Sequence, residues 1–485
     1  MSTVWRRAPG SGCRREPACV VSALINPAWW LICAAVLVCL VAPDPRRTLR
    51  AGLRWATATP VLVLIAFAGV ANLGARAMLG HIVPGDFAQE VVGARSMREG
   101  TALYPDDVNA TVREWLVAEP PAVPAWLPGP PARWLAAAQQ RGRNRLVAQA
   151  HPPTLLLAAA PGILVLGGYG AFWVLTVLTV AVAALTAIVI VTALTPAASR
   201  RERILAVLAL VSWQPVLATV RDGQVSVLIG GLLVLAWADL RRGRDSRAGA
   251  LVGSAAALKL FPLLLLVLLA VRRGRACAAA ALVVAGTIVL AAVVLGPDTW
   301  IQYAASARTI AWSFADAPYN LSLLPRLRSV VPAPFAAIAY PMAAAAALVA
   351  TLLMVKCGGT AAPFIRTLDV EFASMTTLAM LLSPVAWHHY VFTLALPLVV
   401  LVANAWVSGR RAPLVGALSL VAILSIPDDV WRAAWWGMPA SLPALVSPGS
   451  AVLVLWAGLL RVGTGSLSPR GSTDVRPSAR CALAE

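Results

Sequence analysis

The chain has 485 residues, of which 59% are hydrophobic and only 13% charged. Apolar runs long enough to cross a bilayer, about 17–25 residues, recur along it, which excludes an ordinary soluble domain. The net charge of +19 would suggest nucleic-acid binding in a soluble protein, but here arginine pairs stand in short segments between apolar runs. That pattern is typical of cytoplasmic loops and disfavours a nucleic-acid partner. The pairs are Arg46-Arg47, Arg200-Arg201, Arg241-Arg242, Arg272-Arg273 and Arg410-Arg411.

The seven cysteines lie at 13, 19, 33, 39, 277, 357 and 481. They show neither the spacing of a zinc finger nor a compact cluster, so we expect no disulfide framework and no metal site.

The N-terminal part begins with a basic tail, 1–19, followed by an apolar run at 20–42 that has arginines on both sides. This run is either a span or an interfacial helix. It lacks a small-residue cleavage site followed by a soluble domain, which favours an uncleaved anchor over a secretory signal. The next run, 56–79, leads to a long polar stretch at 80–151. If the arginine pairs are cytoplasmic, this stretch is extracytoplasmic.

The stretch at 80–151 is the largest predicted extramembrane segment. Residues 119–131 are dense in proline and predict an irregular loop, whereas 132–149 is rich in arginine and predicts an amphipathic helix on the membrane. Its acidic residues are Asp86, Glu90, Glu99, Asp106, Asp107, Glu114 and Glu119.

The remaining apolar runs predict an all-α polytopic membrane domain at 20–462 with ten to twelve transmembrane helices, followed by a disordered tail at 463–485. These runs lie at 153–195, 204–220, 225–239, 249–271, 276–295, 335–356, 370–386, 390–407, 412–426 and 443–461.

Lys259 lies in the middle of the run at 249–271, in a chain with 38 arginines and only one other lysine, Lys356. An unpaired ammonium at membrane depth costs about 2.5–3.5 kcal/mol or more, so its presence suggests an anion that binds there. The neighbouring Phe261-Pro262 favours a broken or re-entrant pair of short helices, which points to a site. Two simpler interpretations remain: a lysine that snorkels to an interface, or one that pairs with a carboxylate.

Several polar groups fall where spans meet the face opposite the arginine pairs. Each alone fits a simpler explanation, as a helix cap, a turn or an interfacial aromatic belt. Their joint placement on one face favours a functional site. They are Gly85-Asp86, Arg221-Asp222-Gly223-Gln224, Asn320 with Arg326, Trp387-His388-His389, and Asp428-Asp429.

An ordered set of strings over about residues 80–460 resembles the polyprenol-phosphate-sugar-dependent glycosyltransferases of family 87. Where this family commonly has an asparagine after the Gly-Gln pair, the chain has Ser226. The strings are Gly85-Asp86-Phe87, Leu103-Tyr104, His151-Pro152-Pro153, Asp222-Gly223-Gln224-Val225, Ala257-Leu258-Lys259-Leu260-Phe261-Pro262-Leu263, Asn320-Leu321-Ser322, and Leu382-Ser383-Pro384-Val385-Ala386-Trp387-His388-His389.

The resemblance implies a GT-C fold whose active site lies at the extracytoplasmic membrane face and takes a sugar from a lipid-phosphate carrier. Asp86 matches the family's first-loop acid and is our choice of general base. Lys259 would hold the carrier phosphate, with Arg326 or Arg221 as a second contact and His388 or His389 on the phosphate or a sugar hydroxyl. Gln224, Asn320 and Trp387 would recognise sugar. The chemistry needs no cofactor and, in principle, no metal.

We therefore expect a multi-pass enzyme of a bacterial cytoplasmic membrane that moves mannose from a polyprenyl-phosphate donor to a glycolipid or glycan acceptor in envelope synthesis. Arabinofuranosyl transfer by the same mechanism is the alternative. A transporter should show a second broken helix in its other half, and none is evident from the sequence. A flippase or scaffold would not need an acid in the first outer loop together with outer-face amides and histidines.

Overall fold

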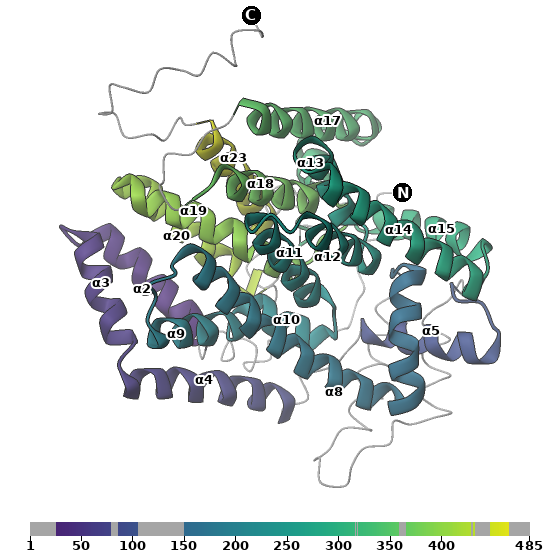
Figure 1. Cartoon of the computed structure of the whole chain (residues 1–485), viewed down its shortest axis with the longest axis horizontal. Helices are drawn as coiled ribbons and strands as arrows, with labels where there is room; N and C mark the ends of the chain where they lie inside the picture. The colour runs from purple at the N-terminus through teal and green to yellow at the C-terminus, as the bar shows by residue number, and fades with distance from the viewer. Residues whose placement is uncertain are drawn as a thin grey trace, which may run out of the picture.

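The computed structural model describes residues 26–78, 86–104, 150–315, 317, 319–357, 365–427, 430–431 and 447–464, and every element in these ranges is helical (Figure 1). The chain is an all-α polytopic membrane protein. Most of both predicted tails, the proline-dense loop and the predicted amphipathic helix at 132–149 lie outside the described residues. The elements are α2 (Pro27–Val41), α3 (Pro45–Ala56), α4 (Thr59–Met78), α5 (Phe87–Glu99), α8 (Pro153–Leu194), α9 (Arg200–Val211), α10 (Gln214–Asp222), α11 (Ser226–Arg241), α12 (Asp245–Leu258), η1 (Phe261–Leu264), α13 (Leu265–Arg272), α14 (Gly274–Leu295), α15 (Asp298–Ser313), α16 (Leu323–Val330), α17 (Ala333–Cys357), α18 (Thr367–Leu382), η2 (His388–Leu394), α19 (Ala395–Ser408), α20 (Arg411–Leu424) and α23 (Pro448–Gly463).

The number of long apolar helices is smaller than the ten to twelve predicted spans. Within the described residues, four helices are long and apolar enough to cross a membrane, or up to six if each of two sharply bent pairs counts as one span. Five shorter apolar helices of 10–17 residues accompany them, α2 among the set. Apolar runs that look continuous in sequence are split by breaks, because bends and short 3₁₀ segments interrupt them. The number of crossings and the role of the first helix stay predictions.

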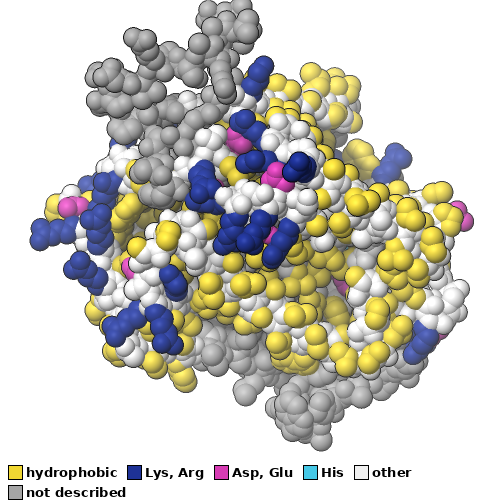
Figure 2. Space-filling model, viewed as in Figure 1, with side chains coloured by type: hydrophobic (Ala, Val, Ile, Leu, Met, Phe, Trp, Pro, Cys, Tyr) yellow, Lys and Arg dark blue, Asp and Glu magenta, His cyan; other side chains and the backbone are white. Residues whose placement is uncertain are grey.

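The arginine-rich ends of the helices meet at one face, here called the basic face. Arg241, at the end of α11, contacts Asp369 of α18 at 2.9 Å. Arg272, at the end of α13, bonds Glu371, which is also on α18, and the carbonyl oxygen of Val355. Figure 2 shows dark blue side chains gathered in the upper centre and along the left edge, with magenta carboxylates among the central ones. Buried Asp369 and Glu371 thus tie several helices together under this face.

The segment predicted to be broken or re-entrant forms a hairpin, α12–η1–α13. Helix α12 ends at Leu258, Lys259 is extended (φ −150°, ψ 138°), and the chain resumes as 3₁₀ helix η1. The end of α13 returns to the start of α12, where Arg273 Nε lies 3.9 Å from Asp245 Oδ1. Both ends of the hairpin are therefore at the basic face. At 1.5 Å per residue, α12 carries Lys259 about 21 Å away from it.

Helix α14 holds the hairpin from one side through very close packing with α12. A Cβ added to Gly249 would overlap the carbonyl oxygen of Ala276, and one added to Gly253 would lie 2.7 Å from that of Ala280. Glycine is required here because the backbones touch, as in close helix pairs of membrane proteins generally. Since both contacts advance four residues in the same direction, α12 and α14 run parallel.

A second break interrupts the chain between α18 and α19. After Leu382 the backbone leaves the helix, and residues His388–Leu394 form 3₁₀ helix η2 before α19 begins. This break lies between two helices, where Ser383-Pro384 ends the first, and not in the middle of one apolar run. The expectation that 249–271 has no broken counterpart in the other half stays a prediction.

Helix α5 shows that part of the polar stretch at 80–151 is buried. Phe87, Val91 and Val92 of α5 pack against Ile163 and Phe172 of α8. Helix α8 itself bends where Gly167 takes a non-helical backbone (φ 70°, ψ 164°), which lets its first part follow α5. In Figure 1, α5 lies against α8 at the lower right, beside the centre of the bundle formed by α10, α11 and α12. This packing brings Asp86 toward the ends of those helices.

Candidate active site

The first turn of α5 presents three polar side chains on one face. Asp86 precedes the helix, and Gln89 and Glu90 follow three and four residues later, the spacing of neighbours on one helix face. The Asp86 carboxylate makes no capping bond to α5. It accepts a hydrogen bond from Gln224 Nε2 at 2.8 Å instead. The predicted first-loop acid therefore faces the bundle.

Gln224 reaches Asp86 because of the way α10 ends. Gly223 takes a left-handed backbone (φ 64°), which glycine adopts without strain, and Gln224 N–H bonds back to the carbonyl oxygen of Thr219 at 2.9 Å. This tight turn directs the Gln224 side chain inward, where the residue is 2% exposed. The Gly-Gln pair is thus a turn, as its simplest interpretation says, and also a site element.

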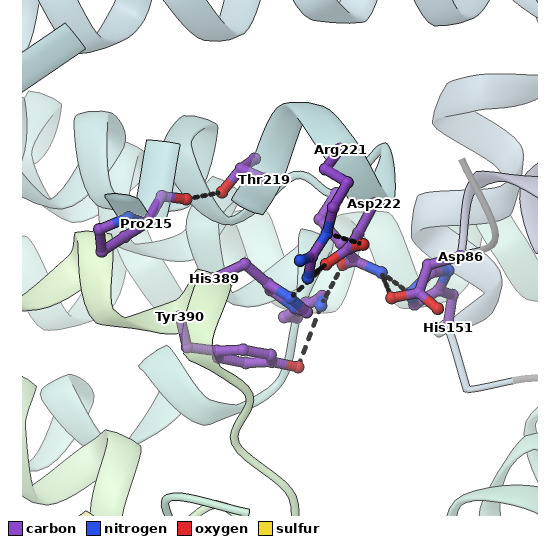
Figure 3. Close-up of polar contacts among 10 residues, drawn as sticks. Asp86, His151, Pro215, Thr219, Arg221, Asp222, His389 and Tyr390 are labelled. Atoms are coloured by element: carbon purple, nitrogen blue, oxygen red, sulfur yellow. Dashed lines mark hydrogen bonds and ion pairs between the residues drawn. The ribbon is translucent and has the colours of Figure 1, made fainter. Parts of the chain in front are cut away.

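Gln224 bridges an acid and a base. Its amide nitrogen donates to Asp86, and its Oε1 accepts from Lys259 Nζ at 2.7 Å. Figure 3 shows these contacts between Asp86 on one side and Tyr390 on the other. Carboxylate and ammonium are therefore separated by a single neutral amide, and they come from segments far apart in sequence.

Lys259 is buried at the tip of the hairpin, 7% exposed. Besides Gln224, its ammonium donates to Tyr390 OH at 3.0 Å and lies 4.3 Å from the centre of that ring. In the described part of the chain, no carboxylate lies within ion-pair distance of Nζ. The two simpler interpretations are therefore wrong, because the side chain neither snorkels to an exposed position nor pairs with an acid.

A second cationic group lies next to this chain of contacts. The guanidinium of Arg221 donates two hydrogen bonds, of 2.9 and 3.0 Å, to the carboxylate of Asp222, and both side chains are partly exposed. His389 Nδ1 lies 3.9 Å from Asp222, and the His389 ring packs on Tyr390. Arg221 and His389 thus lie on the carboxylate of Asp222, next to Tyr390 (Figure 3).

Asn320 and Arg326 lie in a separate cluster that joins backbone segments. The Asn320 amide bonds the carbonyl oxygens of Phe314 and Pro384 and accepts from the N–H groups of Ser322 and Ala386 at 2.9–3.2 Å. Arg326 donates to the carbonyl oxygens of Asn320 and Ser322 and to Ser447 Oγ. No described contact joins either residue to Lys259. Their sugar and phosphate roles stay predictions, whereas their contribution to the loop after α18 is visible.

Trp387 and His388 border that same loop. Trp387 is half-buried, stacks on Tyr319 at 5.4 Å between ring centres and meets the edge of Phe314. His388 Nε2 lies 3.1 Å from the carbonyl oxygen of Leu424. Their predicted roles likewise stay predictions. Of the site residues predicted from the sequence, the structure brings together Asp86, Gln224, Lys259 and His389.

Three residues of the site were not predicted as such: Tyr390, Glu90 and His151. His151 Nδ1 lies 2.8 Å from Glu90 Oε1, and both side chains are buried. The three-and-four spacing of Asp86, Gln89 and Glu90 could have identified Glu90, and the His151-Pro152 string marks the start of α8. Tyr390 carries no sequence signal beyond its place after His388-His389.

Comparison with known proteins agrees with the resemblance. Residues 150–386 match the model of glycosyltransferase family 87. The chain belongs to this family. It is therefore a membrane glycosyltransferase. Searches of curated proteins and of solved structures return no match. The matched range contains Gln224, Lys259, Asn320 and Arg326, whereas Asp86 precedes it and His388 and His389 follow it.

Metal-binding residues do not cluster in the described ranges: no group of three or more His, Cys, Asp or Glu side chains is placed to hold an ion there. The expectation that the reaction needs neither metal nor cofactor stays a prediction.

Proposed function

We propose that this family 87 enzyme transfers a mannosyl group from a polyprenyl-phosphate carrier to a hydroxyl of a glycolipid or glycan, at the outer face of a bacterial cytoplasmic membrane. The observation that carries this proposal is the contact chain Asp86–Gln224–Lys259, which lies at the end of the bundle away from the basic face. Gln224 and Lys259 are buried, and Asp86 is half-buried. An acid and a cation separated by one amide match the two charges that the reaction needs to manage.

The proposed reaction inverts the anomeric centre in one displacement. The acceptor oxygen attacks the anomeric carbon while the bond from that carbon to the phosphate oxygen breaks. The proton of the acceptor hydroxyl passes to Asp86, acting as general base. The electron pair of the broken bond remains on the carrier phosphate as negative charge. Lys259 is placed to stabilise that charge, as a fixed cation in a partly dry site does most effectively.

The surroundings of Lys259 suit a phosphate attached to a lipid. Arg221 and His389 add donors near the ammonium, and an arginine fork binds phosphate oxygens well. Leu260, the residue next to Lys259, is 40% exposed, so an apolar surface adjoins the proposed phosphate site. A polyprenyl chain can lie along this surface within the bilayer. Trp387 and its stacked partner Tyr319 offer an aromatic face for a sugar ring.

A donor panel tests the proposal. Membranes that contain the protein receive radiolabelled polyprenyl-phosphate mannose, arabinofuranose or glucose with extracted envelope lipids as acceptors, and membranes with the D86N variant serve as the control. We expect label transfer from the mannose donor only, absent in the control. Transfer from the arabinofuranose donor alone would replace mannose by the alternative sugar. Transfer from none of the three would contradict the proposed donor class.

A further inference from the structure

Two buried side chains, Glu90 and His151, have no part in the proposed transfer step and lie on the side of Gln224 away from Lys259 along the line of contacts. Their exposed fractions are 3% and 4%, and His151 Nδ1 lies 2.8 Å from Glu90 Oε1. On the opposite edge of the ring, His151 Nε2 lies 3.5 Å from Gln224 Nε2 (Figure 3). The contacts therefore run in one line, from Glu90 through His151 to the amide that bridges Asp86 and Lys259.

One arrangement satisfies the hydrogen-bonding capacities of all the groups along this line. An ionised carboxylate only accepts, so the imidazole nitrogen that faces Glu90, Nδ1, carries a proton. In a neutral imidazole the other nitrogen, Nε2, is then an acceptor. The amide nitrogen of Gln224 has two N–H groups, of which one goes to Asp86 and the second faces His151. The contact at Nε2 is long, and Nδ1 lies close to Glu90 Oε1 without the geometry of a hydrogen bond. Both contacts have to improve in the substrate complex, as catalytic hydrogen bonds commonly do.

The backbone around His151 is held on three sides. Its carbonyl oxygen accepts from Tyr104 OH at 2.8 Å, and burial raises the pKa of Tyr104, so this hydroxyl stays a donor. The preceding N–H of Ala150 donates to Gln89 Oε1 at 2.8 Å, and Thr154 bonds the carbonyl oxygen of Ala257, two residues before Lys259. The imidazole is therefore fixed relative to both α5 and the end of α12.

We propose that Glu90 and His151 are positioning residues for transfer. Glu90 keeps the proton of His151 on Nδ1, and His151 Nε2 then holds the Gln224 amide with its NH₂ toward Asp86 and its carbonyl oxygen toward Lys259. This inference rests on the proposed function, since it takes Asp86 as the base. Its consequence is that the base and the phosphate-binding cation keep a set separation through one amide.

Two replacements of His151 separate positioning from packing. A glutamine amide reaches about as far as Nε2 and keeps an acceptor for Gln224, whereas an asparagine amide reaches only as far as Nδ1 and contacts Glu90 alone. We expect H151Q to keep most of the kcat for transfer. H151N should lower kcat about 10–100-fold, the range for a misplaced catalytic geometry, with little change in the KM for the donor.

Glu90 is tested in the same assay. The amide in E90Q can donate to Nδ1 and so shift the ring proton to Nε2, where it would oppose the Gln224 N–H. We expect E90Q to follow H151N. The matched control is E99Q on the same helix, where Glu99 is exposed and pairs with Arg95, and its kcat should be unchanged. Equal losses in H151Q and H151N, or full kcat in both, would overturn the proposal.

A measurement without substrate keeps this inference separate from the proposed function. The chain has four histidines. In ¹⁵N NMR of the purified protein, the histidine signal that is lost in H151Q should come from a neutral ring that is protonated at Nδ1 and not at Nε2. A ring protonated at Nε2 would overturn the positioning role even if sugar transfer is observed. If instead the wild type transfers no sugar while the Nδ1 proton is found, the donor assignment fails and the proposed arrangement of Glu90, His151 and Gln224 stands.

Discussion

At the scale of single residues, the two opposite charges of the site do not pair directly. Asp86 and Lys259 each bond Gln224, which is neutral, so neither charge neutralises the other. A direct ion pair would have to be broken before a substrate could use either group, and breaking a buried pair is costly. The amide bridge lets the carboxylate accept a proton and the ammonium face a phosphate at the same time.

The Asp86→Asn variant tests the base. We expect it to insert and fold as the wild type does and to lose transfer by about 10²–10⁴-fold, since general-base catalysis contributes that much. The rate of label transfer at saturating donor is the measurement. Asp298→Asn, an exposed acid in the first turn of α15, is the control and should transfer normally. Retention of more than about a tenth of the activity in Asp86→Asn would remove Asp86 from the role.

The Lys259→Met variant tests the cation. Its partners Gln224 and Tyr390 are neutral, so the substitution strands no carboxylate and should leave the melting temperature close to that of the wild type. Donor affinity should fall by about 1.5–3 kcal/mol, the contribution of a hydrogen bond to a charged group. Tyr390→Phe, which keeps the ring and loses one acceptor, should cost about 1 kcal/mol or less. Unchanged donor affinity in Lys259→Met, measured by equilibrium binding, would end the phosphate-site proposal.

Residue types predicted much of this site, and the contacts explain the limits. Lys259 was identified as a rare lysine within an apolar run, and Asp86 and Gln224 by their joint placement at the ends of spans and by the resemblance to family 87. Asn320 and Arg326 carry the same signals but bond mainly to backbone. A polar side chain that recognises a sugar and one that ties two loops look alike in a sequence, since both are buried amides or cations. Only the partner atoms distinguish them.

At the scale of elements, the position of Lys259 depends on the contact between α12 and α14. Gly249→Leu would force a side chain into the backbone of α14 at Ala276, and α12 would have to move. We expect a loss of about 1–3 kcal/mol in stability, the cost of overpacking, together with reduced transfer. Gly286→Ala on α14 is the control, because a Cβ there meets nothing within 4 Å. Thermal unfolding and transfer rates of the two variants check this, and equal behaviour would contradict the packing argument.

The break in α12–η1–α13 was predictable, whereas η2 and the course of α5 were not. Lys259 and Pro262 interrupt an apolar run, which is a local signal. The burial of α5 depends on its fit to α8 beyond the kink at Gly167, and this contact joins residues about seventy positions apart. Hydropathy along the chain contains no information on such a pairing, so a polar stretch was expected where a packed helix lies.

At the scale of the whole molecule, the arginine-rich helix ends and the candidate site lie at opposite ends of the helices. Described arginine-rich ends gather at the basic face, while Asp86, Gln224 and Lys259 lie at the other end of α11 and α12. Helix α11 separates Gln224 from Arg241 by 16 residues, about 24 Å, which is most of the thickness of a bilayer core.

Thiol labelling in intact cells tests which way this arrangement faces. Ser246→Cys near the basic face and Ser313→Cys at the end of α15 are matched replacements of exposed serines, made in a background without native cysteines. We expect an impermeant reagent to label Ser313→Cys and to leave Ser246→Cys unlabelled until the cells are opened. The reverse pattern would place the site on the cytoplasmic side and contradict an extracytoplasmic lipid-phosphate donor.

The hairpin α12–η1–α13 decides on which side of the membrane the later segments lie. Because it enters and leaves at the same face, it contributes an even number of crossings, none or two, and α14 starts on the side where α12 started. A count that treats 249–271 as a span would invert every later segment and put the loop of Asn320 on the side opposite Asp86. The ribosome also completes this hairpin before α14 exists, and Tyr390, a partner of Lys259, lies 131 residues further along the chain. The contacts of the cation can therefore be complete only after both α14 and η2 have been made.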